Sequence, residues 1–178
     1  MSSGRQHPLH SLGQLLRAYQ ADRVFNPYRD CDPTLDRPDA PATRQQNLRR
    51  YLEAFADARY LLVGEAPGYA GCRFSGIPFT CEAQIVGQGA LPWTCDLGLC
   101  QSSTGAPYRE RSASVVWEAL DGRHDCALWN VFPWHPFGDT PLSNRKPTRA
   151  ELRQGVEVLR TVLTLFAGAQ VYAIGRTS

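Results

Sequence analysis

Three short apolar runs constrain the fold of this chain more than any other feature. They cover residues 60–63, 127–129 and 171–174. Apolar runs of this length, bounded by turn residues, are typical of buried strands. Helical periodicity lies between them, so strands and helices alternate, and this order predicts parallel pairing with right-handed crossovers. We therefore expect a three-layer α/β/α fold around a short parallel sheet.

Capping signals place two of the helices. Thr43 and Gln46 have the spacing of a capping box before a helix that leads into the first strand, and Thr148 and Glu151 repeat this spacing before the last helix. A shorter helix is expected over residues 114–120.

The chain of 178 residues predicts a single domain. Residues 1–42 contain an amphipathic helix and a proline-rich loop that wraps the domain, and residues 43–178 form the α/β core. Hydrophobic residues at 43% and charged residues at 20% fit an ordinary globular protein. No apolar run approaches the length of a membrane span, and the start lacks the apolar core of a signal peptide. We expect a cytoplasmic protein with reduced cysteines.

Charge alone does not indicate a nucleic-acid binder, because the net charge is only +2. Lys146 is the only lysine among 19 basic side chains. Arginine suits bidentate contact with phosphate, but a compositional bias explains the same count.

Polar and glycine residues follow two of the apolar runs directly. Residues 64–68 read Gly-Glu-Ala-Pro-Gly after the first run, and Asn130 ends the second. Open α/β sheets bind ligands at the carboxyl ends of their strands. Glycine there lets the main chain approach a flat ligand. We expect a binding site at this edge of the sheet.

Four motifs together resemble the uracil-DNA glycosylase superfamily over about residues 60 to 178. Residues 64–68 resemble its first signature, in the spelling of its thermostable iron–sulfur branch. The Gly-Ile-Pro-Phe stretch at residues 76–79 is similar to the segment whose aromatic ring stacks on the flipped base. Residues 128–130 resemble the strand whose terminal Asn reads uracil. Residues 141–148 resemble a family loop of the form Pro-x-x-Asn-Arg-x-Pro-Thr that precedes a helix.

The resemblance implies two catalytic residues, Glu65 and Asn130. A carboxamide at Asn130 has both the donor and the acceptor that complement the edge of uracil and disfavour cytosine. Glu65 contributes through water or only bonds to neighbouring backbone. Ala66 stands where the most active branch of the family has an Asp that orients the attacking water. We therefore expect modest rates.

The resemblance also implies a set of base-binding residues. Phe79 supplies the stacking face. Gly68 leaves space that a bulky Tyr fills in some relatives to exclude the thymine methyl group, and whether Tyr69 refills it stays open. His135 either donates to the base or is a rigid loop histidine. The full set is Gly64, Ala66, Gly68, Tyr69, Phe79 and His135.

Four further residues are expected to contact DNA. Asn144 and Arg145 precede a helix N-terminus, where phosphate binding competes with simple capping. Arg73 and Ser75 lie between the two glycine motifs and are expected at the backbone beside the flipped nucleotide, although a solvated Arg fits equally.

Two departures from the family pattern matter. The family continues with a helix, a fourth strand and a His-Pro-Ser-like loop whose His binds the base, and the sequence stops before these. The resemblance thus implies a missing final strand, damaged catalysis and an exposed edge at residues 171–174 that invites dimerisation. Second, six cysteines include no Cys-x-x-Cys pair. We expect no iron–sulfur cluster, no cofactor and no metal. A metal site that includes Cys72, Cys81 and Cys95 is the weaker alternative to buried thiols.

The sequence therefore supports an enzyme that removes uracil, and in a wider reading other deaminated bases, from DNA. A truncated, non-catalytic DNA-binding module is the alternative. A small-molecule binder on a flavodoxin-like sheet is weaker, because neither a phosphate-binding loop nor a dinucleotide fingerprint is present. The expected partner is uracil-containing DNA, with no membrane and no obligate protein partner.

Overall fold

The computed structural model describes residues 3–87, 91–94 and 96–175. Its main sheet contains β2 (Tyr60–Gly64), β3 (Cys126–Asn130) and β5 (Gln170–Ala173). The strand order is β3-β2-β5, and both neighbouring pairs are parallel. The short parallel sheet expected from the apolar runs is confirmed.

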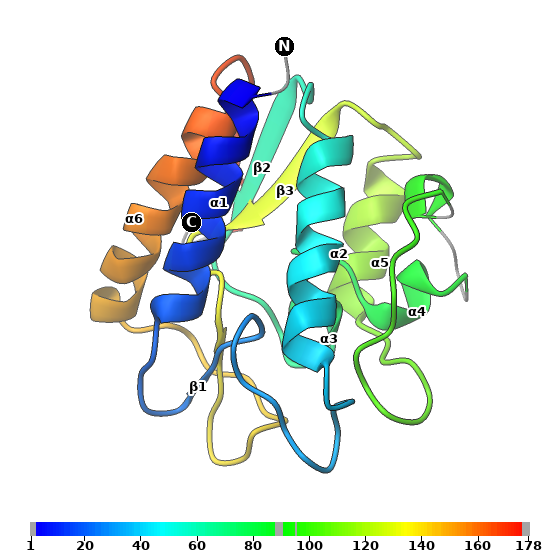
Figure 1. Ribbon diagram of the computed structural model, residues 1–178, viewed down its shortest axis with the longest axis vertical. Coiled ribbons are helices and arrows are strands. Elements are labelled where there is room, and N and C mark those ends of the chain that lie inside the picture. Colours follow the sequence, from blue (N-terminus) through cyan, green and yellow to red (C-terminus); the bar gives the residue numbers. More distant parts are fainter. Residues whose placement is uncertain (1–2, 88–90, 95, 176–178) are drawn as a thin grey trace.

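Helices flank this sheet. The longer ones are α1 (Ser3–Ala18), α2 (Ala40–Ala54), α5 (Arg111–Ala119) and α6 (Arg149–Leu165), and the shorter ones are α3 (Cys72–Ser75), α4 (Glu82–Ile85) and the 3₁₀ turn η1 (Pro92–Thr94). Helices α1 and α6 lie side by side, and α2 and α5 lie in the other half of the molecule (Figure 1). The protein therefore has the α/β architecture that the alternating sequence pattern predicts.

The core is built from large apolar side chains that meet around the sheet. Tyr51 of α2 and Phe55, which follows its last residue, pack with Trp93 and Trp117, with ring centroids between 4.8 and 6.2 Å apart in the contacting pairs. All five residues of β3 are buried. Each large apolar side chain that is removed from water contributes about 1.5–3 kcal/mol. This rigid centre fixes the carboxyl ends of β2 and β3.

The N-terminal segment is hydrogen-bonded to later parts of the chain. The Arg37 amide donates to the Ser102 carbonyl at 2.8 Å, and the Thr104 amide donates to the Leu35 carbonyl at 2.8 Å. Strand β1 (Val24–Phe25) pairs antiparallel with β4 (His135–Pro136). The segment is thus tied to the chain that follows β3.

One of the two predicted helix starts is wrong and the other is confirmed. Helix α2 begins at Ala40, after an Asp39 whose side chain makes no cap, and a proline lies in its first turn. Proline is favourable there, because its missing N–H would be unpaired anyway. At α6 the Glu151 amide donates to Thr148 Oγ1 at 3.2 Å, and the Thr148 amide donates to the Glu151 carboxylate at 2.7 Å.

Strand β5 is an exposed edge strand. Val171 and Tyr172 retain 51% and 50% of their accessible surface. Among the described residues, no helix is long and apolar enough to cross a membrane.

Candidate functional site

The site begins with the register of two strands. Gly64 and Asn130 are register partners at the carboxyl ends of β2 and β3. Asn130 is 1% exposed, and its Oδ1 has no hydrogen-bond partner among the described residues. Buried polar atoms are rarely left unpaired, so this acceptor is available to a ligand at the edge of the sheet.

Phe79 joins the same point from another segment. A Cβ placed on Gly64 would lie 2.9 Å from Cε2 of Phe79, still closer to its Cζ, and 3.0 Å from Asn130 Oδ1. Only glycine tolerates such close approach. The aromatic ring and the carboxamide therefore converge on Gly64.

Phe79 is held in an unusual backbone conformation. Its φ is 52°, in the left-handed region that non-glycine residues rarely adopt. Trp117 Nε1 donates to the Phe79 carbonyl at 2.9 Å. Residues kept in this region by their surroundings cluster at functional sites.

Glu65 and Ala66 follow β2 on the rim of the site, and both are half-buried. The Glu65 carbonyl accepts from the Phe132 amide at 2.9 Å. Its carboxylate accepts no hydrogen bond from the described part of the chain, so the alternative of a purely backbone-bonded carboxylate has no support here. Ala66 packs against the edge of the core.

Polar side chains hold the next three residues of this loop. His135 Nδ1 lies 3.3 Å from the Pro67 carbonyl, and the Tyr69 amide donates to Asn144 Oδ1 at 2.9 Å. The carboxylate of Glu110 packs against Gly68, where its Oε1 would collide with an added Cβ. The loop is therefore fixed rather than open.

His135 contacts this loop. It is fully buried, and burial lowers its pKa to about 4, so the ring is neutral near pH 7. Because a carbonyl only accepts, the contact with Pro67 places the ring proton on Nδ1. Nε2 has no hydrogen-bond partner among the described residues. The contact with Pro67 fits the alternative of a rigid loop histidine, and donation to the base stays a prediction.

Glu110 was missed by the sequence reasoning. Its carboxylate occupies the positions that a Cβ on Gly68 or on Gly71 would need. The space beside Gly68 is thus filled by Glu110 and not by Tyr69. Burial raises the pKa of Glu110. No spacing in the sequence links residue 110 to residues 68–71, and a Glu just before a helix gave no further signal.

The prediction that Arg73 and Ser75 contact DNA is wrong in this structure, because both are fully buried. Arg73 Nη1 pairs with Asp36 Oδ1 at 2.7 Å. The guanidinium also lies 3.9 Å from the ring centroids of Phe25 and Phe74. The Ser75 hydroxyl donates to the Ile77 carbonyl at 3.1 Å. Both side chains stabilise the fold instead.

Asn144 lies at the surface, whereas Arg145 has a structural role. Asn144 is exposed beside the loop that it holds. Arg145 forms a bidentate pair with Glu151 at 2.7 and 2.8 Å, and this pair lowers the pKa of Glu151. Arg145 therefore serves the start of α6, the capping alternative, and only Asn144 has its polar group at the rim.

The cysteines give no cluster in the described part of the chain. Cys72, Cys81 and Cys126 are buried, and Cys31 and Cys100 are exposed. Burial raises the pKa of Cys72 to about 12, which keeps its thiol protonated. Cys95, which belonged to the weaker metal alternative, lies outside the described residues. No group of three or more potential metal-binding side chains occurs among the described residues.

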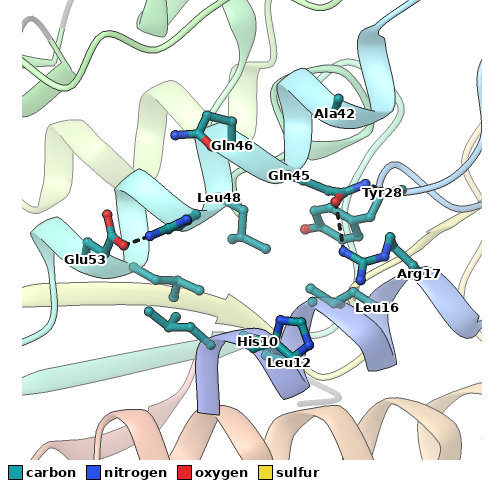
Figure 2. A pocket seen from close by; sticks show the side chains of 14 residues that line it. His10, Leu12, Leu16, Arg17, Tyr28, Ala42, Gln45, Gln46, Leu48 and Glu53 are labelled. Carbon is teal, nitrogen blue, oxygen red and sulfur yellow. Dashed lines mark hydrogen bonds and ion pairs between the residues drawn. The ribbon is translucent and has the colours of Figure 1, made fainter. Parts of the chain in front are cut away.

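A groove of about 690 Å³ lies elsewhere, between α1 and α2 (Figure 2). Its floor includes Leu12, Leu16 and Leu48, and Arg17 donates to Gln45 at 2.9 Å across it. None of its lining residues belongs to the site at Gly64.

A protein-family model matches most of this chain. The model of the uracil DNA glycosylase superfamily matches residues 52–178. The chain belongs to this superfamily.

A solved structure has the same fold. Wild-type SMUG2 from Pedobacter heparinus is 17% identical, with a TM-score of 0.57, and the match covers 96% of this chain and 76% of the SMUG2 chain. At this identity the likeness shows the fold alone. No curated protein matches the sequence.

Proposed function

We propose that the protein is a DNA glycosylase that hydrolyses the N-glycosidic bond of uracil in DNA and leaves an abasic site. One observation carries the proposal: the Phe79 ring and the Asn130 carboxamide meet at Gly64, at the carboxyl edge of the sheet. Glycosylases take the target base out of the stack and hold it between an aromatic face and hydrogen-bonding groups.

Asn130 distinguishes uracil from cytosine. Its unpaired Oδ1 accepts the N3–H of uracil, and its amide N–H donates to the neighbouring uracil carbonyl. Cytosine has an unprotonated N3 and an amino group at these two positions, so each contact becomes a mismatch. A buried donor or acceptor that is left without a partner costs about 1–3 kcal/mol, so the two Asn130 contacts select uracil over cytosine.

Phe79 and Gly64 supply the surface on which the base lies. Stacking of a base on an aromatic side chain contributes about 1–3 kcal/mol. Gly64 has no side chain to separate the ring from the carboxamide. Because the backbone of Phe79 is fixed by Trp117, the ring is pre-oriented and little ordering cost remains on binding.

Hydrolysis needs a water at C1′ of the deoxyribose. The oxygen of this water bonds to C1′, the C1′–N1 bond breaks, and its electron pair leaves with uracil as an anion. Glu65 is the candidate to hold the water and accept its proton, because its carboxylate is half-buried at the rim and unengaged within the described residues. Ala66 has no group for this step, so we expect a slow, largely dissociative reaction.

The base range follows from the same contacts. Other deaminated bases that present a carbonyl next to an N–H offer Asn130 the same edge, and we expect slower removal of them. The exposed Asn144 stands beside the loop and is the remaining candidate among the four residues proposed for contact with the DNA backbone.

The test is a labelled oligonucleotide with one uracil, treated with excess pure protein and then with alkali to break abasic sites. We expect cleavage at uracil only. Asn130→Ala removes it, and Gln154→Ala, an exposed amide on α6, leaves it unchanged. Absence of cleavage with retained DNA binding refutes the enzyme and favours the non-catalytic alternative.

A further inference from the structure

Three polar side chains from three separate segments contact three consecutive residues of the loop after β2. His135 approaches the Pro67 carbonyl, the Glu110 carboxylate packs against Gly68, and Asn144 accepts from the Tyr69 amide. We call residues 67–71 the glycine loop. Contacts from separate segments to successive residues fix a loop that its own glycines leave free.

The Glu110 carboxylate lies inside the bend of this loop. A Cβ on Gly71 would lie 2.7 Å from Glu110 Cδ, and a Cβ on Gly68 would collide with Oε1. Glu110 occupies the N-cap position of α5, yet its side chain makes no cap bond to that helix. It turns to the glycine loop instead, where it packs against Gly68 and Gly71.

This placement is costly for stability. Burial disfavours the ionised carboxylate, and none of the ion pairs within the described residues includes Glu110. A half-buried acid without an ion-pair partner among the described residues, packed against two glycines beside a candidate site, points to a functional task.

We propose that Glu110 is a positioning residue: its carboxylate fixes the glycine loop, and through it the Glu65 side chain, in the geometry that hydrolysis requires. The catalytic consequence rests on the proposed glycosylase function. The contact between Glu110 and the glycine loop does not depend on that function, so the contact and its catalytic consequence are tested separately.

Amide hydrogen exchange followed by NMR tests the contact without any activity. In Glu110→Ala, the Gly68 amide should exchange about tenfold faster or more, because the carboxylate that packs against Gly68 and Gly71 no longer restrains local opening of the loop. The Tyr69 amide, held by Asn144, should change less and serves as the internal control. Glu110→Gln keeps the size of the side chain and should give intermediate exchange. Unchanged Gly68 exchange in Glu110→Ala overturns the proposal.

A double-mutant cycle with Gly68→Ala tests the packing. In the wild-type background the new Cβ meets the carboxylate. In the Glu110→Ala background its nearest neighbour is Asn144 Nδ2 at 3.6 Å, an ordinary contact. Thermal unfolding should therefore show a large loss of midpoint for Gly68→Ala alone and a small one when Glu110→Ala is present. Equal losses in both backgrounds overturn the proposal.

Uracil excision supplies the catalytic readout. Glu110→Ala should lower kcat by about tenfold or more with little change in KM, because Asn130 and Phe79 still bind the base. Glu110→Gln should restore part of kcat. A raised KM with unchanged kcat contradicts a positioning role. If the wild type excises nothing, the glycosylase proposal fails, and the exchange and unfolding experiments still test the contact.

Discussion

Protonation of His135 should weaken the fold between about pH 6.5 and pH 4. Its pKa is lowered from 6.5 to about 4, chiefly by burial. The unfolded state therefore takes up a proton first as the pH falls, and the stability that the neutral ring contributes is complete only above about pH 6.5. The gap between the two pKa values corresponds to about 3 kcal/mol in total, of which about 2 kcal/mol is lost by pH 5.

His135→Asn is the perturbation that isolates this effect. The Asn amide replaces the Nδ1–H donor toward the Pro67 carbonyl but does not titrate. Urea unfolding at pH 7.5 and pH 5.0 should show that the wild type loses about 2 kcal/mol more than the variant. The raised pKa of Glu110 acts with the opposite sign, because its folded state takes up the proton first, but it does so in both proteins.

The matched control is His124→Asn at an exposed turn, which should keep the pH dependence of the wild type. If His135→Asn loses as much stability on acidification as the wild type, then His135 is not held neutral by burial, and the tautomer assigned to it is wrong.

Other variants test separate parts of the structure. Gly64→Ala should displace the ring of Phe79, lower the unfolding free energy by about 1–3 kcal/mol and abolish excision; wild-type activity in this variant refutes the convergence at Gly64. Arg73→Met should lower the free energy of unfolding in urea by about 1.5–3 kcal/mol, because Asp36 loses one of its two buried arginine partners and keeps Arg44; unchanged stability with weaker DNA binding would instead support a contact between Arg73 and DNA. Sedimentation velocity should show concentration-dependent association through β5 that Val171→Lys removes, and a monomeric wild type at high concentration contradicts this.

The features that depend on residues close together in the sequence were predictable from it. The apolar runs gave the strands, and parallel pairing necessarily brings the carboxyl ends of neighbouring strands together, so Gly64 and Asn130 were expected at one edge. The Thr148 capping box was also predictable, because its bonds span only three residues.

Long-range pairing was not predictable from one sequence. Arg73 meets Asp36 across 37 residues, through a wrapping loop whose path no periodicity indicates. The same holds for Glu110, which reaches the glycine loop only because α5 is placed beside it. The start of α2 was missed because a proline in the first turn outweighed the Thr43 signal.

The most direct measurement compares excision of uracil, cytosine and thymine from otherwise identical oligonucleotides under single-turnover conditions, for the wild type and for Asn130→Ala. We expect the wild type to release uracil but not cytosine, and Asn130→Ala to release neither; thymine, which presents the same edge as uracil, shows whether the site excludes the 5-methyl group. Equal release of uracil by both proteins would contradict a site built on Asn130, and equal release of uracil and cytosine by the wild type would contradict base reading by its carboxamide.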